Sequence, residues 1–135
     1  MQFGKPIERT YFRRQDEMLM TAPGVYWLDD GITGHQRQSI ALAHALELGA
    51  VQARSFALRQ PYQALSPRWL RPNARALASQ HQLAPGSIVV SCGRRAAAAA
   101  QAYRALNPSL RLIQILDPGG DLGRYDVVVL PAHDR

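Results

Sequence analysis

Hydrophobic residues in this chain gather in short runs, and polar, helix-forming stretches separate them. The third and fifth runs are dominated by isoleucine and valine, which is typical of strands that are covered on both faces. The second run is less regular because Gln52, Arg54 and Ser55 interrupt it. The pattern predicts five strands, at residues 25–28, 51–58, 87–91, 110–116 and 126–130.

Helices are predicted in the stretches between these runs. Thr33 and Gln36 have the spacing of a capping box, and Gly49 supplies a stop signal for the first helix. Pro72 is a start signal for the second helix, and Asn107-Pro108 ends the third, which is rich in alanine. The predicted helices are residues 35–48, residues 74–83 and the stretch that follows Cys92-Gly93-Arg94-Arg95.

Strands that alternate with helices indicate right-handed crossovers and a parallel sheet. We therefore predict an α/β domain with a doubly wound, five-stranded parallel sheet, Rossmann-like in strand order 3-2-1-4-5, with a flavodoxin-like order as the alternative. The domain spans residues 23–135, and residues 1–22 form a flexible leader or an extension from a misassigned start. The predicted core consists of Trp27, Leu28, Ile88, Val89, Val90, Ile113, Ile115, Val127, Val128 and Val129.

Composition limits the class of protein. A chain of 135 residues has room for one hydrophobic core, and its 47% hydrophobic content is typical of globular domains. The single cysteine, Cys92, excludes an intramolecular disulfide framework and a zinc cluster, which favours the cytoplasm. No apolar run approaches the roughly 18 residues of a membrane span, and no signal peptide is visible, so neither membrane insertion nor export is expected.

The formal charge of +6 is unevenly distributed. Residues 61–111 contain arginines but no Asp or Glu, whereas residues 112–135 are net acidic. No ribonucleoprotein motif or recognition helix accompanies the charge, so nucleic acid is not an expected partner. Arg68, Arg71 and Arg75 have the spacing of a basic stripe on a helix, although Pro72 interrupts the run and a solvated face is the simpler interpretation.

Two loops at predicted helix starts contain the main candidate residues. The first contains Asp30, Gly31, Gly34 and His35, at a helix N-terminus where unpaired backbone N–H groups favour an anion. It matches neither G-x-G-x-x-G nor the P-loop, so no nucleotide cofactor is predicted. In a purely structural interpretation, the two glycines serve the turn and Thr33 caps the helix.

The second loop contains Gly93, Arg94 and Arg95, where paired arginines precede another helix. A phosphate, pyrophosphate or carboxylate is a fitting ligand there. Alternatively, Arg95 pairs with an acidic residue such as Asp117 or Asp126, and Arg94 is solvated. Cys92 has no base partner in the sequence, which argues against a nucleophile.

Three further residues are possible contributors to a site at the carboxyl ends of the strands. Asp117 follows the fourth strand, and His133 and Asp134 follow the fifth. Adjacent side chains on extended backbone point apart, so His133 and Asp134 are poorly placed for a catalytic pair. No metal site is predicted.

Three separated motifs, taken in order, resemble the amino-terminal half of the mitochondrial-fission, elongated-mitochondria-like family. The resemblance covers residues 24–134, with departures at Gln36 and Ala132, where acidic residues are common, and at Gly119, where arginine is common. The motifs are Trp27 with Asp30-Gly31, Gly34-His35 and Gln38; Ser91-Cys92-Gly93-Arg94-Arg95; and Gln114, Asp117-Pro118, Tyr125-Asp126, Pro131 and His133-Asp134.

This resemblance implies a relationship to GT-B glycosyltransferases, in which two Rossmann-like domains face each other across a cleft. Because the resemblance concerns the first half, we expect a noncatalytic module that binds an anion, such as a phosphate-bearing small molecule, or a partner. The alternative is half of a nucleotide-sugar-dependent, glycosyltransferase-like enzyme, completed by a second Rossmann-like domain, another chain or a homo-oligomer. A truncated gene product without activity is the third possibility.

Overall fold

The computed structural model describes residues 23–64, 70–78 and 82–132. Within them, five strands form one parallel sheet, so the predicted α/β class and sheet are confirmed. The strands are β1 (Val25–Asp29), β2 (Val51–Ser55), β3 (Ile88–Cys92), β4 (Arg111–Ile115) and β5 (Val127–Val129). The helical elements of these residues are α2 (Thr33–Ala45), α3 (Gly93–Leu106) and the short 3₁₀ turns η1 (Ala74–Ala76) and η2 (Leu122–Arg124).

The strand order is β2-β1-β3-β4-β5, which is the flavodoxin-like alternative and not 3-2-1-4-5. β2 forms one edge of the sheet, and its Gln52 and Ala53 are exposed. β3 pairs with β1 on the opposite side, where Trp27 aligns with Val90. The polar β2 is suited to an edge, whereas the apolar β3 belongs in the centre, and this explains why the first expected order was wrong.

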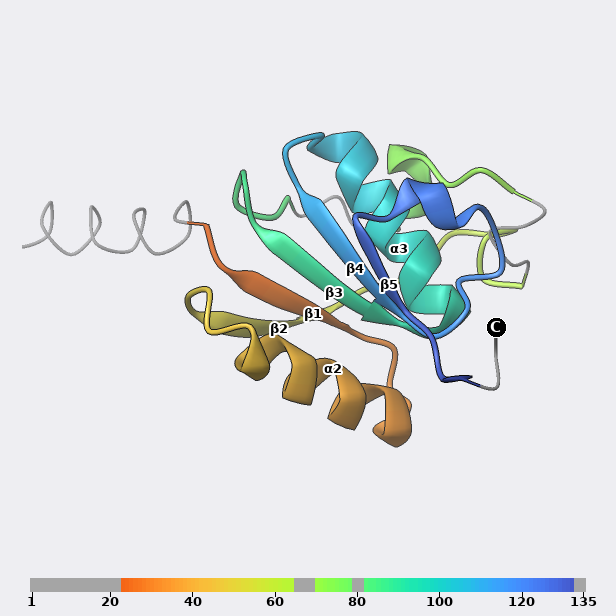
Figure 1. The fold of residues 1–135 in the computed structure, drawn as a ribbon. Helices are drawn as coiled ribbons and strands as arrows, with labels where there is room; N and C mark the ends of the chain where they lie inside the picture. Colours follow the sequence, from red (N-terminus) through yellow and green to blue (C-terminus); the bar gives the residue numbers. More distant parts are fainter. Residues whose placement is uncertain (1–22, 65–69, 79–81, 133–135) are drawn as a thin grey trace, which may run out of the picture.

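The two α-helices cover opposite faces of the sheet (Figure 1). On one face, the fully buried alanines of α3 pack on residues such as Val89 and Leu112. On the other face, Ala43 of α2 belongs to a cluster with Val90 and Ile113. Successive residues of β3 thus point to opposite faces, as expected for a strand between two helical layers. Both helices begin where a strand ends, at the carboxyl edge of the sheet.

The predicted core is only partly correct at the β5 edge. Val127 and Val129 are 49% and 44% exposed, whereas the neighbouring Ile113 and Ile115 are buried. The register pairs each valine with one of these isoleucines, so all four lie on the face that α2 covers. In Figure 1, α2 lies on the lower face of the sheet, where it packs chiefly against β1 and β3 and not against β5. The remaining predicted core residues are buried or partly buried.

The helix predicted at residues 74–83 is wrong where the structure describes it. Only the single turn η1 forms, and the Asn73 side chain caps it by accepting from the backbone N–H of Arg75 at 2.9 Å. Leu77 then leaves the helical conformation and forms an isolated antiparallel bridge with Leu58. Both leucines are almost completely buried, so tertiary packing has overridden local helix propensity. Without that helix, Arg71 and Arg75 form no helical stripe, and Arg68 lies outside the described residues.

Candidate functional site at the switch point of the sheet

The strand order reverses direction between β1 and β3. The chain passes from β1 through α2 to β2 on one side, and from β3 through α3 to β4 on the other. In open α/β sheets, ligands bind outside the carboxyl ends of the strands at this switch point. The two loops that the sequence singled out flank it, because one follows β1 and the other follows β3.

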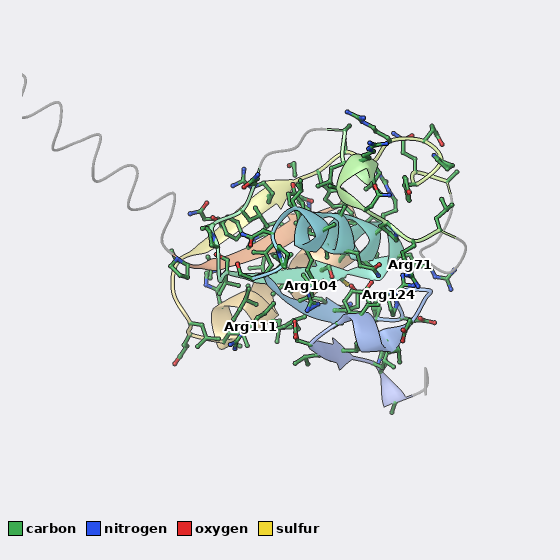
Figure 2. All side chains as sticks on the ribbon, turned by 90° about the horizontal axis from the view of Figure 1, so that it is seen from above. Arg71, Arg104, Arg111 and Arg124 are labelled. Carbon is green, nitrogen blue, oxygen red and sulfur yellow. The ribbon has the colours of Figure 1, made fainter. Side chains whose placement is uncertain are left out.

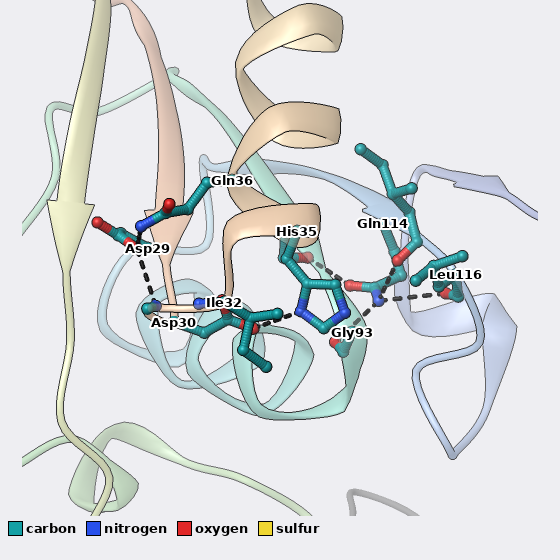
Figure 3. A network of polar contacts seen from close by, with 11 residues as sticks. Asp29, Asp30, Ile32, His35, Gln36, Gly93, Gln114 and Leu116 are labelled. Atoms are coloured by element: carbon teal, nitrogen blue, oxygen red, sulfur yellow. Dashed lines mark hydrogen bonds and ion pairs between the residues drawn. The ribbon is translucent and has the colours of Figure 1, made fainter.

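The loop after β1 is fixed by the carboxylates of Asp29 and Asp30 (Figure 3). Asp29 Oδ1 accepts from the N–H of Gly31 at 2.9 Å and from the side-chain amide of Gln36 at 2.8 Å. Asp30 Oδ1 accepts from the N–H of Ile32 at 3.0 Å. Gly31 has φ +82°, a left-handed conformation that favours glycine, so it does serve the turn.

The predicted capping box of α2 is wrong. The N-cap residue is Ile32, which offers no side-chain cap, and Thr33 is already the first helical residue. The Gln36 amide bonds to the Asp29 carboxylate instead of to a helix N–H. The carboxylates of the loop therefore supply the negative charge that a capping glutamate would otherwise place near the helix N-terminus.

Asp30 and His35 form an ion pair across this loop. Asp30 Oδ2 lies 2.6 Å from His35 Nδ1, and the two side chains are 2% and 25% exposed, respectively. The buried carboxylate accepts a hydrogen bond from Nδ1–H, which fixes the ring and leaves Nε2 for another partner. The pair joins two residues that the sequence analysis named separately, and it orients a partly exposed imidazole at the carboxyl edge of the sheet.

The His35 ring also packs on the backbone of Gly93, where α3 begins (Figure 3). A Cβ at Gly93 would lie 2.5 Å from His35 Cε1, and Gly93 has φ +86°. Glycine is therefore required there for two independent reasons, space and conformation. Gly34 differs, because a Cβ there would meet nothing within 4 Å and its φ is not positive. The turn interpretation therefore accounts for Gly31 but not for Gly34.

Arg94 and Arg95 are exposed in the first turn of α3, which contains no acidic residue. Among residues 23–64, 70–78 and 82–132, neither side chain has an ion-pair or hydrogen-bond partner. The alternative pairing of Arg95 with Asp126 is wrong, because Asp126 pairs with Arg104 at 3.0 Å. The Asp117 carboxylate instead accepts a hydrogen bond from the backbone N–H of Gly119 in its own loop, at 2.9 Å. Two unpaired cations thus lie at the positive end of a helix dipole.

Gln114 is the residue whose role the sequence analysis missed, since it was used there only as part of a motif. It is fully buried, and its Oε1 accepts a hydrogen bond from the Ser91 hydroxyl. Its Nε2 lies 3.0 Å from the carbonyl oxygen of Gly93 and 2.9 Å from that of Ile115. The amide therefore joins the start of α3 to the end of β4 beneath the candidate site. A polar residue inside the apolar run from Leu112 to Leu116 was the signal in the sequence that could have revealed this role.

Similarity to known proteins shows the family to which the chain belongs. The model of the family described as Mitochondrial fission ELM1 matches residues 33–135, which is most of the chain. The chain belongs to the mitochondrial fission ELM1 family. The match begins at the first residue of α2, so it contains His35, Arg94 and Arg95 but not Asp30. No curated protein and no solved structure matches this member of the ELM1 family significantly.

The remaining candidates in this ELM1-family chain contribute less to the site. Burial raises the pKa of Cys92 from 9.0 to about 11, and the nearby charge of Asp30 adds to the effect. Its thiol therefore stays protonated at neutral pH, which argues against a nucleophile. Asp117 is exposed at the same edge, after Leu116, whereas His133 and Asp134 lie outside the described residues.

Neither a metal cluster nor a membrane-spanning helix is present in the described part of this ELM1-family chain. No group of three or more His, Cys, Asp or Glu residues there is arranged to hold a metal ion. None of the helices in those same residues has both the length and the apolar character needed to cross a membrane.

Proposed function

We propose that this Rossmann-like ELM1-family module binds a phosphate-bearing small molecule at the start of α3 and is noncatalytic by itself. The observation that supports this most strongly is the pair of exposed arginines, Arg94 and Arg95, which have no partner among the described residues. They lie beside His35 at the switch point of the sheet. We call Asp30, His35, Gly93, Arg94 and Arg95 the switch-point site.

Electrostatics explains why an anion belongs there. A cation in the first turn of a helix opposes the helix dipole and costs about 0.3–1 kcal/mol at low ionic strength. Two such cations, with no acidic residue in the same turn, leave α3 less stable than its alanine-rich sequence allows. A bound phosphate makes the electrostatic free energy at this helix end favourable. It accepts hydrogen bonds from the backbone N–H groups and from the guanidinium groups of Arg94 and Arg95.

His35 adds a third ligand-directed group. Its ring is held by Asp30 through Nδ1 and rests on Gly93, so its position is determined by the fold. The side chain is 25% exposed, and in the imidazolium form, with Nδ1–H on Asp30, the Nε2–H donates a hydrogen bond to the anion. Arginine forks and an oriented imidazole together recognise a phosphate better than a single carboxylate, which offers fewer acceptor oxygens.

Calorimetric titration of the full chain with inorganic pyrophosphate tests the proposal. The double variant Arg94→Ala/Arg95→Ala removes two charges, and we expect its affinity to fall at least tenfold, because charge-assisted hydrogen bonds contribute about 1.5–3 kcal/mol each. The matched control is Arg37→Ala/Arg111→Ala, since both of these arginines are exposed and lie in α2 and at the start of β4. Equal affinities for the two double variants would contradict the proposal.

The Asp30–His35 pair favours a second function, as half of a glycosyltransferase-like enzyme. An imidazole held at Nδ1 by a buried carboxylate is suited to accept a proton at Nε2 from an acceptor hydroxyl. Transfer of a sugar also requires the donor to be held opposite, and orienting two reactants supplies roughly 7–11 kcal/mol of barrier reduction. One edge of one sheet contacts a substrate from one side, so a second Rossmann-like domain or another copy must provide the other.

Release of nucleoside diphosphate from nucleotide sugars distinguishes the two functions. We expect none from the purified monomeric chain, and release only when a second Rossmann-like domain is added if the enzyme function is correct. His35→Ala should then abolish that release, whereas Arg37→Ala should not change it. Turnover by the monomeric chain alone would contradict the noncatalytic proposal.

A further inference from the structure

A second group of arginines lies along α3, away from its first turn. A pocket of about 430 Å³ opens there between α3, η2 and the segment before η1. Figure 2 shows Arg71, Arg124 and Arg104 one after another across this region, and Arg111 beyond Arg104 is not among the lining residues. We call it the arginine pocket, and its lining residues are Arg71, Pro72, Gln101, Arg104, Ala105 and Arg124.

The arginine pocket is distinct from the switch-point site. Arg104 follows Arg95 by more than two helical turns, which places it about 13 Å further along the axis of α3. Arg71 and Arg124 come from other segments, one before η1 and one in η2. Three cations from distant parts of the sequence therefore meet at a second place on the surface.

Two of these guanidinium groups are held in place by the fold. Arg104 Nη1 donates to the backbone carbonyl of Arg124 at 2.9 Å, and its Nη2 donates to the Asp126 carboxylate at 3.0 Å. Arg124 Nη1 donates to Gln101 Oε1 at 3.2 Å. A guanidinium has five N–H donors, so each of these groups retains donors that are not used within the protein. Such groups lose little conformational freedom when they bind a ligand.

The buried Tyr125 hydroxyl fixes the orientation of the Gln101 side chain. Its amide nitrogen donates to the Tyr125 hydroxyl at 2.5 Å, and the glutamine is only 8% exposed. Burial raises the pKa of Tyr125 to about 12, so this phenol remains protonated across the neutral range. The Tyr125 hydroxyl donates to the Ala97 carbonyl and a guanidinium has only donors, so the Gln101 carbonyl oxygen faces Arg124 and its amide nitrogen faces the phenol. A buried chain of polar groups thus positions the arginine.

The charge of the pocket is unbalanced. Among the residues that the structure describes, no acidic side chain lines the pocket, and Asp126 neutralises only one of the three arginines. Arg71 is exposed, and no residue within the described ranges forms an ion pair or hydrogen bond with its side chain. Two positive charges are thus left without a counter-ion beside a concave surface. Their mutual repulsion is relieved by an anion that contacts both.

We infer that the arginine pocket is a second anion site, independent of the switch-point site, for a small molecule with a phosphate or pyrophosphate group. Its volume lies in the range of small-molecule sites, about 300–1,000 Å³. The anion contacts the free donors of Arg104 and Arg124, and the unpaired Arg71 closes over it. Pro72 and Ala105 supply apolar surface for the remainder of the molecule.

Titration of the full-length Arg94→Ala/Arg95→Ala variant with inorganic pyrophosphate tests the second site, because the first has been removed. Backbone amide signals of Gly123 and Ala105 report on the pocket by nuclear magnetic resonance. We expect saturable shifts of both signals. Adding Arg71→Glu should weaken binding at least tenfold without disturbing the fold, since Arg71 is exposed and has no partner among the described residues. Adding Arg111→Glu, a matched charge reversal, should leave binding unchanged.

Equal binding in the Arg71→Glu and Arg111→Glu backgrounds would overturn the inference, as would shifts confined to the start of α3. Much tighter binding of a single-stranded RNA than of pyrophosphate, with a steep salt dependence, would also overturn it, because a small-molecule site has no extended track for a backbone. The two proposals fail separately. If the Gly123 signal shows no pyrophosphate binding, the arginine pocket is refuted and the switch-point site is unaffected. If the Arg94→Ala/Arg95→Ala variant binds as well as its control, the switch-point site is refuted and the arginine pocket is unaffected.

Discussion

The loops that lead into α2 and α3 occupy equivalent places at the carboxyl ends of adjacent strands, but their charges are opposite. The α2 loop carries two carboxylates, and Asp30 also holds His35. The start of α3 has no acidic residue and carries Arg94 and Arg95 instead. The first helix start is neutralised from within the chain, whereas the second lacks an anion. The comparison indicates that a shared fold position does not determine which helix start receives a ligand.

The largest effect is expected where the two loops touch. Gly93→Ala forces a left-handed conformation on an L-residue, which costs about 1–2 kcal/mol, and it also displaces His35 from contact with Asp30. We expect the free energy of unfolding to fall by roughly 3 kcal/mol in urea denaturation, once the lost charge-assisted hydrogen bond is included. Gly34→Ala is the matched control, and it should be neutral or stabilising by up to about 1 kcal/mol. Similar stability of the two variants would show that the loops are not in contact.

Breaking the ion pair directly should cost somewhat less. Asp30→Asn removes the charge that His35 contacts at 2.6 Å, and a hydrogen bond between charged groups contributes about 1.5–3 kcal/mol. A double-mutant cycle with His35→Ala measures the coupling, since the two effects should not add. Additive losses would mean that the pair contributes nothing to stability.

A smaller effect of opposite sign is expected at the start of α3. Without an anion, Arg94→Ala/Arg95→Ala should stabilise the fold by about 0.6–2 kcal/mol at low ionic strength, because two unfavourable charges leave the positive helix end. Salt should reduce the gain, whereas Arg37→Ala/Arg111→Ala should show none. Thermal melting with saturating pyrophosphate should reverse the ranking, because the unmodified chain binds the ligand at both sites, whereas the variant retains only the arginine pocket. Destabilisation in the absence of anion would contradict the account.

The smallest effect is expected at Cys92, which lies beneath the α2 loop. Its pKa is raised in the fold from 9.0 to about 11, so the protein favours the protonated thiol. This contribution to stability is fully present below pH 9 and is lost as the pH rises from 9 toward 11. Asp30→Asn removes the lesser cause of the shift, and the pKa should fall slightly. The ultraviolet absorbance of the thiolate, followed against pH, measures the pKa of Cys92 in the unmodified chain and in the Asp30→Asn variant. Cys92→Ala serves as the blank. A thiol that is half ionised at pH 9 in the folded chain would refute the prediction.

Hydrophobic periodicity predicted the sheet and both α-helices, because these elements depend on local patterns. It did not predict the strand order, although the polar residues of β2 marked an edge strand that could not take a central place. The second predicted helix failed because the burial of Leu77 against Leu58 depends on a contact that the local sequence does not reveal. Likewise, His35 and Gly93 were both candidates, but only the three-dimensional arrangement shows that one packs on the other.

The buried Gln114 has a consequence for how this family can vary in evolution. Its amide contacts the Ser91 hydroxyl and the carbonyl of Gly93. Replacing Gln114 alone by leucine therefore removes these hydrogen bonds from two buried polar groups. Replacing Ser91 alone by alanine leaves the amide oxygen unpaired in the same way. The viable route between a polar and an apolar pair therefore passes through a coordinated change at both positions. Related chains should carry both polar residues or neither, a pattern that would appear as covariation between two neighbouring strands.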